Sequence, residues 1–193
     1  VLQEKTKSGA LVILDVRTGD VLAMASWPQY DPNIFIPAIS QEDYTKLQND
    51  PTNPLYARAF RGAYPPASTF KVVVSLAALE AGSVTEQTLF PCPTSLAIGD
   101  RVFRNWNKKG EGSINVGGAC TRACSTWFYQ AALLTGAAPV FEMAQRLGFG
   151  KATGLPLPAE AKGFVATDRW SREKYGNPLL SGDLANMAIG QGT

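Results

Sequence analysis

The chain has 193 residues, with 18 lysines and arginines against 16 acidic residues, which gives a formal net charge of +2. This length fits one large domain or part of one, and a hydrophobic fraction of 45% excludes a disordered chain. A nearly neutral chain gives no electrostatic reason to expect a nucleic-acid partner. The sequence has no histidine, which excludes every catalytic triad and metal site that needs an imidazole.

The first predicted element is a β-hairpin. Residues 10–16 and 21–25 are two apolar, β-branched runs, and a polar four-residue link that contains Gly19 joins them. Because both runs are almost wholly apolar, we expect helices to cover both faces of the hairpin. From Trp27 to Ala67 prolines interrupt the chain repeatedly, and within this long loop residues 41–49 predict one short helix.

A buried helix is predicted over residues 68–81. Two prolines precede it, Gly82 supplies its C-terminal stop, and its residues are apolar on nearly all sides, so it should run through the centre of the protein. The polar stretch that follows, residues 83–118, predicts no strand. Further helices are predicted over residues 119–134 and 138–147, and a last short segment over residues 183–189.

The predicted strands are too few for a stable sheet, since two strands alone are only marginally stable in water. Either strands are hidden in the loops, or the rest of the sheet lies beyond Thr193, and we favour the second interpretation. The longest apolar run, residues 72–81, is too short to cross a bilayer.

Cysteine gives little functional information. The chain has three, Cys92, Cys120 and Cys124, in no spacing typical of zinc or redox sites. The spacing of four between Cys120 and Cys124 would place both on one helix face. We predict buried, small apolar side chains, with a disulfide or a reactive thiol as the alternative.

Ser68 and Lys71 carry the predicted chemistry. Serine and lysine at positions i and i+3 share one helix face, and burial lowers the pKa of a lysine towards that of a general base. A serine at a helix N-terminus also lies near the positive end of the helix dipole, where its N–H can face a developing oxyanion. An isolated match of this spacing is more often a capping serine with a solvated lysine. Here the apolar helix argues against an exposed lysine.

Six ordered motifs resemble the transpeptidase domain of class B penicillin-binding proteins, and are most similar to the elongation-type penicillin-binding protein 2. The motifs, in chain order, are GALVILDVRTGDVLAMAS, YDPN, YPPASTFK, FRNW, ACSTWFYQ and AIGQGT. The resemblance implies an α/β (α+β type) fold shared with serine β-lactamases, in which an antiparallel sheet with packed helices lies beside a mostly helical subdomain. It also implies no metal or organic cofactor.

By this resemblance Ser68 is the acylated nucleophile and Lys71 is the base that activates it. The reaction would transfer the acyl group of a peptidoglycan stem peptide ending in D-Ala-D-Ala to a neighbouring amine, and β-lactam antibiotics would acylate the same serine. The intact protein would be anchored in the cytoplasmic membrane with this domain on its periplasmic side. Its expected partners are nascent peptidoglycan and the membrane glycan polymerase of the elongation machinery, with no nucleic acid.

The sequence departs from the family pattern at three places. Ala67 stands where the family has glycine, which is a strained choice if its φ is positive. The second motif, Ser-x-Asn or Ser-x-Asp, aligns with Ala123-Cys124-Ser125, so Ser125 is the only polar candidate there. It either substitutes for the motif's polar residues or is only a helix residue bonded to a backbone carbonyl.

The third departure is the Lys-Thr-Gly motif, which does not occur in the chain. In the family this strand supplies an oxyanion donor and binds the substrate carboxylate. We therefore expect residues 1–193 to be a partial transpeptidase domain without the membrane anchor, the pedestal and the C-terminal strands. Losing one oxyanion donor costs roughly 10²–10³ in rate, so the isolated chain should be a poor transpeptidase.

Three other functions stay open at this stage. A serine β-lactamase would share the fold but hydrolyse its acyl-enzyme. A β-lactam sensor would be acylated without cross-linking peptides, and a degenerate scaffold would not be acylated at all. The absence of a hydroxyl at Ala123 motivates the last two.

Overall fold

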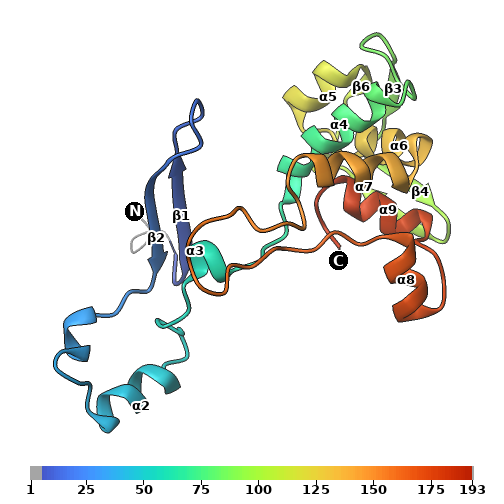
Figure 1. Ribbon diagram of the computed structural model, residues 1–193. Helices are drawn as coiled ribbons and strands as arrows, with labels where there is room; N and C mark the ends of the chain where they lie inside the picture. Colours follow the sequence, from blue (N-terminus) through green and yellow to red (C-terminus); the bar gives the residue numbers. More distant parts are fainter. Residues whose placement is uncertain (1–5, 193) are drawn as a thin grey trace. The chain divides into compact units, whose positions relative to one another are not determined.

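The computed structural model describes residues 6–192, and the chain divides into two compact units. The first unit runs to Ala63 and also includes Gly154–Ala161. Its elements in chain order are β1 (Gly9–Leu14), β2 (Val21–Trp27), the 3-10 helix η1 (Pro32–Phe35), α2 (Gln41–Asn49) and α3 (Arg58–Arg61) (Figure 1).

Strands β1 and β2 form the predicted antiparallel hairpin. The short helix α3 packs against both strands, and the Ala59 N–H donates a hydrogen bond to Ser26 Oγ at 3.0 Å. The expectation that helices cover both faces is wrong for the described chain, because Val12 and Leu22 are 43% and 66% exposed. A helix of four residues is too short to cover strands of six and seven.

Helix α2 has the bounds that the sequence predicts. It begins after Ser40, whose Oγ accepts a hydrogen bond from the Asp43 N–H at 3.0 Å and so satisfies one of the free N–H groups of the first turn. This cap and the acidic residues of the first turn favour a helix at this place in a proline-rich loop.

The second unit is mostly helical and comprises Tyr64–Thr153 and the chain from Lys162 onwards. Two small antiparallel sheets, β3 with β6 and β4 with β5, accompany its helices. The protein therefore has antiparallel strands with packed helices and a mostly helical unit. This confirms the predicted α+β class. The elements in chain order are η2 (Ala67–Phe70), α4 (Lys71–Glu80), β3 (Phe90–Cys92), β4 (Ser95–Ile98), β5 (Arg101–Arg104), β6 (Gly112–Ile114), α5 (Val116–Arg122), α6 (Ser125–Thr135), α7 (Ala137–Arg146), α8 (Asp168–Tyr175) and α9 (Ser181–Ala188).

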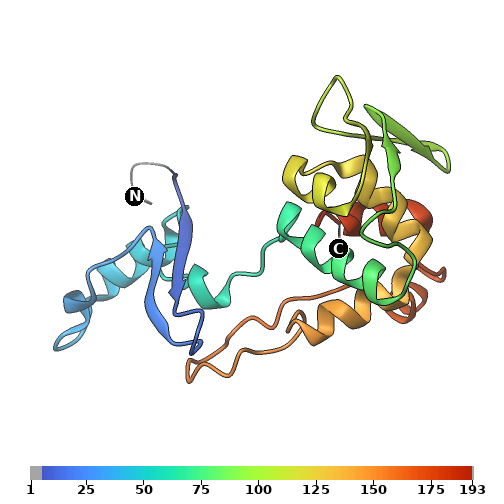
Figure 2. The same ribbon diagram turned by 90° about the horizontal axis from the view of Figure 1, so that it is seen from above.

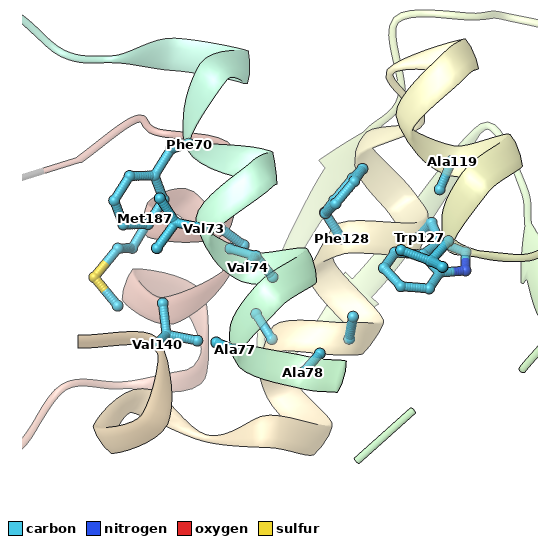
Figure 3. Close-up of a cluster of buried hydrophobic side chains, with 14 of the residues drawn as sticks. Phe70, Val73, Val74, Ala77, Ala78, Ala119, Trp127, Phe128, Val140 and Met187 are labelled. Atoms are coloured by element: carbon cyan, nitrogen blue, oxygen red, sulfur yellow. The ribbon is translucent and has the colours of Figure 1, made fainter. Parts of the chain in front are cut away.

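Helix α4 is the centre of this unit, as its apolar sequence predicts. It packs against α5, α6 and α7, which lie around it in both views (Figure 2). Val74 and Ala78 have no exposed surface, and neither have Trp127 and Phe128 on α6. Figure 3 shows these side chains converging between the helices. The apolar burial that stabilises the unit therefore also fixes the position of the residues at the start of α4.

Three predictions about elements in the second unit were wrong. The polar stretch 83–118 contains the four strands β3–β6, which are only three or four residues long and lack a clear apolar alternation. Helix α8, which Thr167 caps by accepting a hydrogen bond from the Trp170 N–H, lies in a stretch with no predicted element. The helix predicted over residues 119–134 is two helices, because the chain turns at Ala123 with φ +48°.

The same turn separates the cysteines that were expected on one helix face. Cys124 is fully buried and Cys120 is exposed, while Cys92 is buried on β3. Burial as small apolar groups is thus confirmed for two of the three thiols, and each of the three is free.

The predicted helix over residues 68–81 begins as the 3-10 turn η2 and becomes α-helical at Lys71. Ala67, the first residue of η2, has φ +50°. The backbone strain expected for an alanine with a positive φ is therefore present at this position. Its N–H donates to the carbonyl oxygen of Gly190 at 3.1 Å. A Cβ atom on Gly190 would overlap the Ala67 carbonyl oxygen, so only glycine fits there.

Replacing Ala67 by glycine should stabilise the protein. A left-handed conformation costs a non-glycine residue about 1–2 kcal/mol, and the greater freedom of glycine in the unfolded chain offsets part of the gain. We expect Ala67→Gly to raise the free energy of unfolding by about 0.5–1 kcal/mol in denaturant titrations. The matched control is Ala81→Gly at φ −72°, which should lower it. Equal losses at both positions would contradict the assignment of strain to Ala67.

Candidate active site

Ser68 and Lys71 line one cavity of about 900 Å³ in the second unit. Ser68 lies in η2 and is exposed, whereas Lys71 begins α4 and is only 4% exposed. The cavity wall continues along β5 and the residues after it, through the turn between α5 and α6, and to the end of α9. The other lining residues are Ala67, Arg101, Val102, Phe103, Arg104, Asn105, Trp106, Ala123, Ser125, Tyr129, Asn186, Ile189 and Gln191.

The amine of Lys71 is held by two oxygen acceptors. Its Nζ donates to the Ala123 carbonyl oxygen at 2.7 Å and to Ser125 Oγ at 3.2 Å. It also lies 5.4 Å from the centre of the Phe128 ring. Burial lowers the pKa of Lys71 from its ordinary value, and the neighbouring Cys124 and Cys120 partly oppose this. The predicted direction of the pKa shift is therefore confirmed.

The turn at Ala123 explains how the Ala123 carbonyl oxygen and Ser125 both reach Lys71. Ala123 ends α5 in a left-handed conformation, and Ser125 is the first residue of α6. The Ser125 N–H donates to Asn105 Oδ1 at 2.9 Å, which fixes the start of α6. In the described part of the chain, Ser125 Oγ bonds to the Lys71 amine and to no backbone carbonyl. The structure therefore does not support the alternative that Ser125 is only a helix residue whose hydroxyl bonds to a backbone carbonyl.

The sequence analysis did not single out Asn105. It is only 8% exposed, and its Nδ2 has no hydrogen-bond partner among residues 6–192. A polar side chain between Phe103 and Trp106 is the signal that could have identified it. Its neighbour Trp106 is 62% exposed and lines the cavity, with its Nε1 donating to the Arg122 carbonyl oxygen at 2.9 Å.

Other residues of the sequence motifs stabilise the fold. Trp127, Phe128 and Tyr129 are buried in the core. In the first unit, Asp31 orders its loop, because its Oδ1 accepts hydrogen bonds from the N–H and the Nδ2 of Asn33, each at 2.9 Å.

Together the cavity offers an exposed hydroxyl at the start of a helix and a buried amine one turn along. A hydroxyl and a nearby uncharged amine are the elements of nucleophilic catalysis without histidine. No cluster of His, Cys, Asp or Glu suited to a metal ion occurs within residues 6–192. Over the same residues, no helix has both the length and the apolarity to cross a membrane.

Removing the Asn105 side chain should destabilise the second unit. In Asn105→Ala the Ser125 N–H loses its acceptor in a buried place, and an unsatisfied buried donor costs about 1–3 kcal/mol. Denaturant titrations should show a loss of this size in the free energy of unfolding. Asn177→Ala, at an exposed position, is the control and should change stability by less than about 0.5 kcal/mol. A similar small change in both variants would contradict the structural role of Asn105.

Comparison with known proteins supports the resemblance seen in the sequence. The family described as "Penicillin binding protein transpeptidase domain" matches residues 9–193. The peptidoglycan D,D-transpeptidase MrdA of Escherichia coli K12 is 40% identical over 185 residues, which cover 95% of this chain and 29% of that protein. The protein of the same name from Haemophilus influenzae is 39% identical over 95% of this chain and 29% of its own.

Solved structures are similar over nearly the whole chain. Penicillin-binding protein 2 of Pseudomonas aeruginosa, in complex with WCK 5153, has a TM-score of 0.90 and 36% identity, covering 98% of this chain and 43% of that one. Penicillin-binding protein 2 of Helicobacter pylori has a TM-score of 0.92 and 35% identity, with coverages of 96% and 35%. This chain spans less than a third of the length of the curated relatives named above. From its sequence and its fold, the chain belongs to the penicillin-binding protein transpeptidase domain family.

Proposed function

We propose that this chain carries the acylating serine and lysine of a peptidoglycan D,D-transpeptidase, with Ser68 as nucleophile and Lys71 as general base. The observation that carries the proposal is the buried Lys71 amine, whose pKa burial lowers, in the cavity that Ser68 also lines. The names of the similar proteins, peptidoglycan D,D-transpeptidases, support the substrate class.

The proposed reaction has two acyl transfers. Uncharged Lys71 takes the proton of Ser68 Oγ, which attacks the carbonyl carbon of the penultimate D-alanine of a stem peptide. The peptide bond breaks, the terminal D-alanine leaves with a proton on its amine, and an ester to Ser68 remains. The amine of a second stem peptide then attacks this ester, forms the cross-link and returns the proton to the serine. The Ser68 N–H, at the start of a helix, stabilises the oxyanion of each step.

Ser125 is our candidate for the hydroxyl that passes protons between Lys71 and the leaving amine. Its Oγ lies 3.2 Å from Lys71 Nζ, and the family's serine position is occupied by Ala123, which has no hydroxyl. The Ala123 carbonyl oxygen keeps the Lys71 amine in place while the Ser125 hydroxyl exchanges its proton. A β-lactam would acylate Ser68 by the same first step.

The cellular setting is proposed from the relatives. One solved relative is a complex between penicillin-binding protein 2 and MreC of Helicobacter pylori, and another is described as a peptidoglycan synthase complex that coordinates polymerization and crosslinking. We infer that the intact protein works with a membrane glycan polymerase at the periplasmic side of the cytoplasmic membrane. We also infer that residues 1–193 are one part of its transpeptidase domain.

Fluorescent penicillin should label the full-length protein that contains this chain at Ser68. Ser68→Ala should abolish labelling, and Lys71→Met should slow it by about 10²–10⁴-fold, the usual contribution of a general base. Because uncharged Lys71 is the reactive form, the wild-type rate should rise with pH to a midpoint below 10.5, and this rise should vanish in Lys71→Met. Lys108→Met, on an exposed turn, is the control and should label normally. Normal labelling of Ser68→Ala would refute the proposal.

A second candidate function is a binding module that is acylated but does not cross-link. Ala123 favours it, because the usual hydroxyl of the second motif is absent. A stable penicillin adduct on Ser68, with no cross-linked product from stem peptides and a polymerase partner, would support this candidate. Rapid release of hydrolysed penicillin would instead indicate a β-lactamase.

A further inference from the structure

We propose that Arg101 and Arg104 form a carboxylate-binding subsite in the wall of the cavity that Ser68 lines. The subsite would take a side-chain carboxylate of the acyl-donor peptide, at a residue further from the reacting bond than the terminal D-alanine. This inference rests on the proposed function for the identity of the peptide, and it goes beyond the serine and lysine chemistry.

The first supporting observation is the place of the two arginines. They begin and end β5, the strand that pairs with β4 along one edge and from which the cavity wall continues to Trp106. Both side chains are exposed, and both residues line the cavity together with Ser68. A peptide held at Ser68 would therefore lie in a cavity that two arginine residues line.

The second observation is that neither guanidinium has a partner within the chain. Among residues 6–192, neither Arg101 nor Arg104 forms an ion pair or a side-chain hydrogen bond. Other arginines of this chain are used differently. Arg122 and Arg146 pair with Glu111 and Glu80, respectively.

The third observation is the chemistry of the wall itself. None of the described lining residues is an aspartate or a glutamate, so no acidic side chain of the cavity neutralises the two arginines. Glu111, which lies between β5 and α5 in the sequence, is already bonded to Arg122 and Asn107. The wall thus has an excess of donors and positive charge.

These properties favour a carboxylate over other ligand groups. The planar guanidinium fork of arginine matches a carboxylate with two parallel hydrogen bonds, and a cleft of one charge sign raises the local concentration of the opposite ion. The resemblance assigns the terminal carboxylate of the donor to the Lys-Thr-Gly strand. We therefore assign the arginine pair to a second carboxylate on the same peptide.

A matched pair of penicillins tests the subsite through acylation. Carbenicillin differs from benzylpenicillin by one added carboxylate on its side chain. In the full-length protein that carries this chain, R101Q together with R104Q should lower the acylation rate constant for carbenicillin by about three- to tenfold. The constant for benzylpenicillin, which lacks this second carboxylate, should fall by a smaller factor than the constant for carbenicillin. R172Q, on α8 away from the cavity, is the control and should change neither.

A binding experiment tests the same subsite without acylation. In the Ser68→Ala variant, acetyl-Glu-D-Ala-D-Ala should bind about three- to tenfold more tightly than the isosteric acetyl-Gln-D-Ala-D-Ala when titrated by NMR. Adding R101Q and R104Q should remove this difference, and so should about 1 M salt, which screens exposed charges.

The outcomes separate this inference from the proposed function. A glutamate preference that the arginine substitutions remove supports the subsite, even if no penicillin acylates the wild type and the proposed function fails. Equal binding of the two peptides to Ser68→Ala overturns the subsite, and so does a carbenicillin to benzylpenicillin ratio that R101Q and R104Q leave unchanged. Ser68 labelling can remain normal in either of these cases.

Discussion

The hydrogen bond from the buried Lys71 amine to the Ala123 carbonyl oxygen is the contact on which the site depends. An amine placed in an apolar core costs free energy unless oxygen acceptors surround it, and here the backbone of a helix break provides one. The left-handed turn at Ala123 directs that carbonyl oxygen to the amine, and α6 starts two residues later, at Ser125. One backbone feature thus holds the amine and brings Ser125 Oγ beside it.

In this arrangement one group, the Ala123 carbonyl oxygen, holds the Lys71 amine, and another, Ser125, supplies a hydroxyl. A carbonyl oxygen accepts hydrogen bonds from either charge state of an amine, but it cannot exchange a proton. Ser125 Oγ can do so, and Asn105 fixes its position by accepting a hydrogen bond from the Ser125 N–H. The loss of the family's serine at Ala123 therefore removes a side chain from the site without removing the backbone contact that positions Lys71.

A second constraint places Ser68 at the surface of the cavity. The chain before it is fixed by the close approach of Gly190 to Ala67, where two residues with positive φ meet and the Ala67 N–H bonds to the Gly190 carbonyl oxygen. The apolar packing of α4 then holds the other side of Ser68, with Val74 fully buried in the core. Local backbone strain of this kind persists only where the surrounding structure determines it, which is typical of functional sites.

The sequence by itself determined the elements with strong local signals. The hairpin, helix α2 after its Ser40 cap, and the apolar helix α4 follow from patterns within a few residues, and so does the spacing of Ser68 and Lys71, one turn apart. Only the tertiary structure decided the rest. Strands β3–β6 are too short to show a period, and β3 pairs with β6, which follows two other strands in the sequence. The break at Ala123 and the burial of Asn105 depend in the same way on groups from other segments, which no local pattern contains.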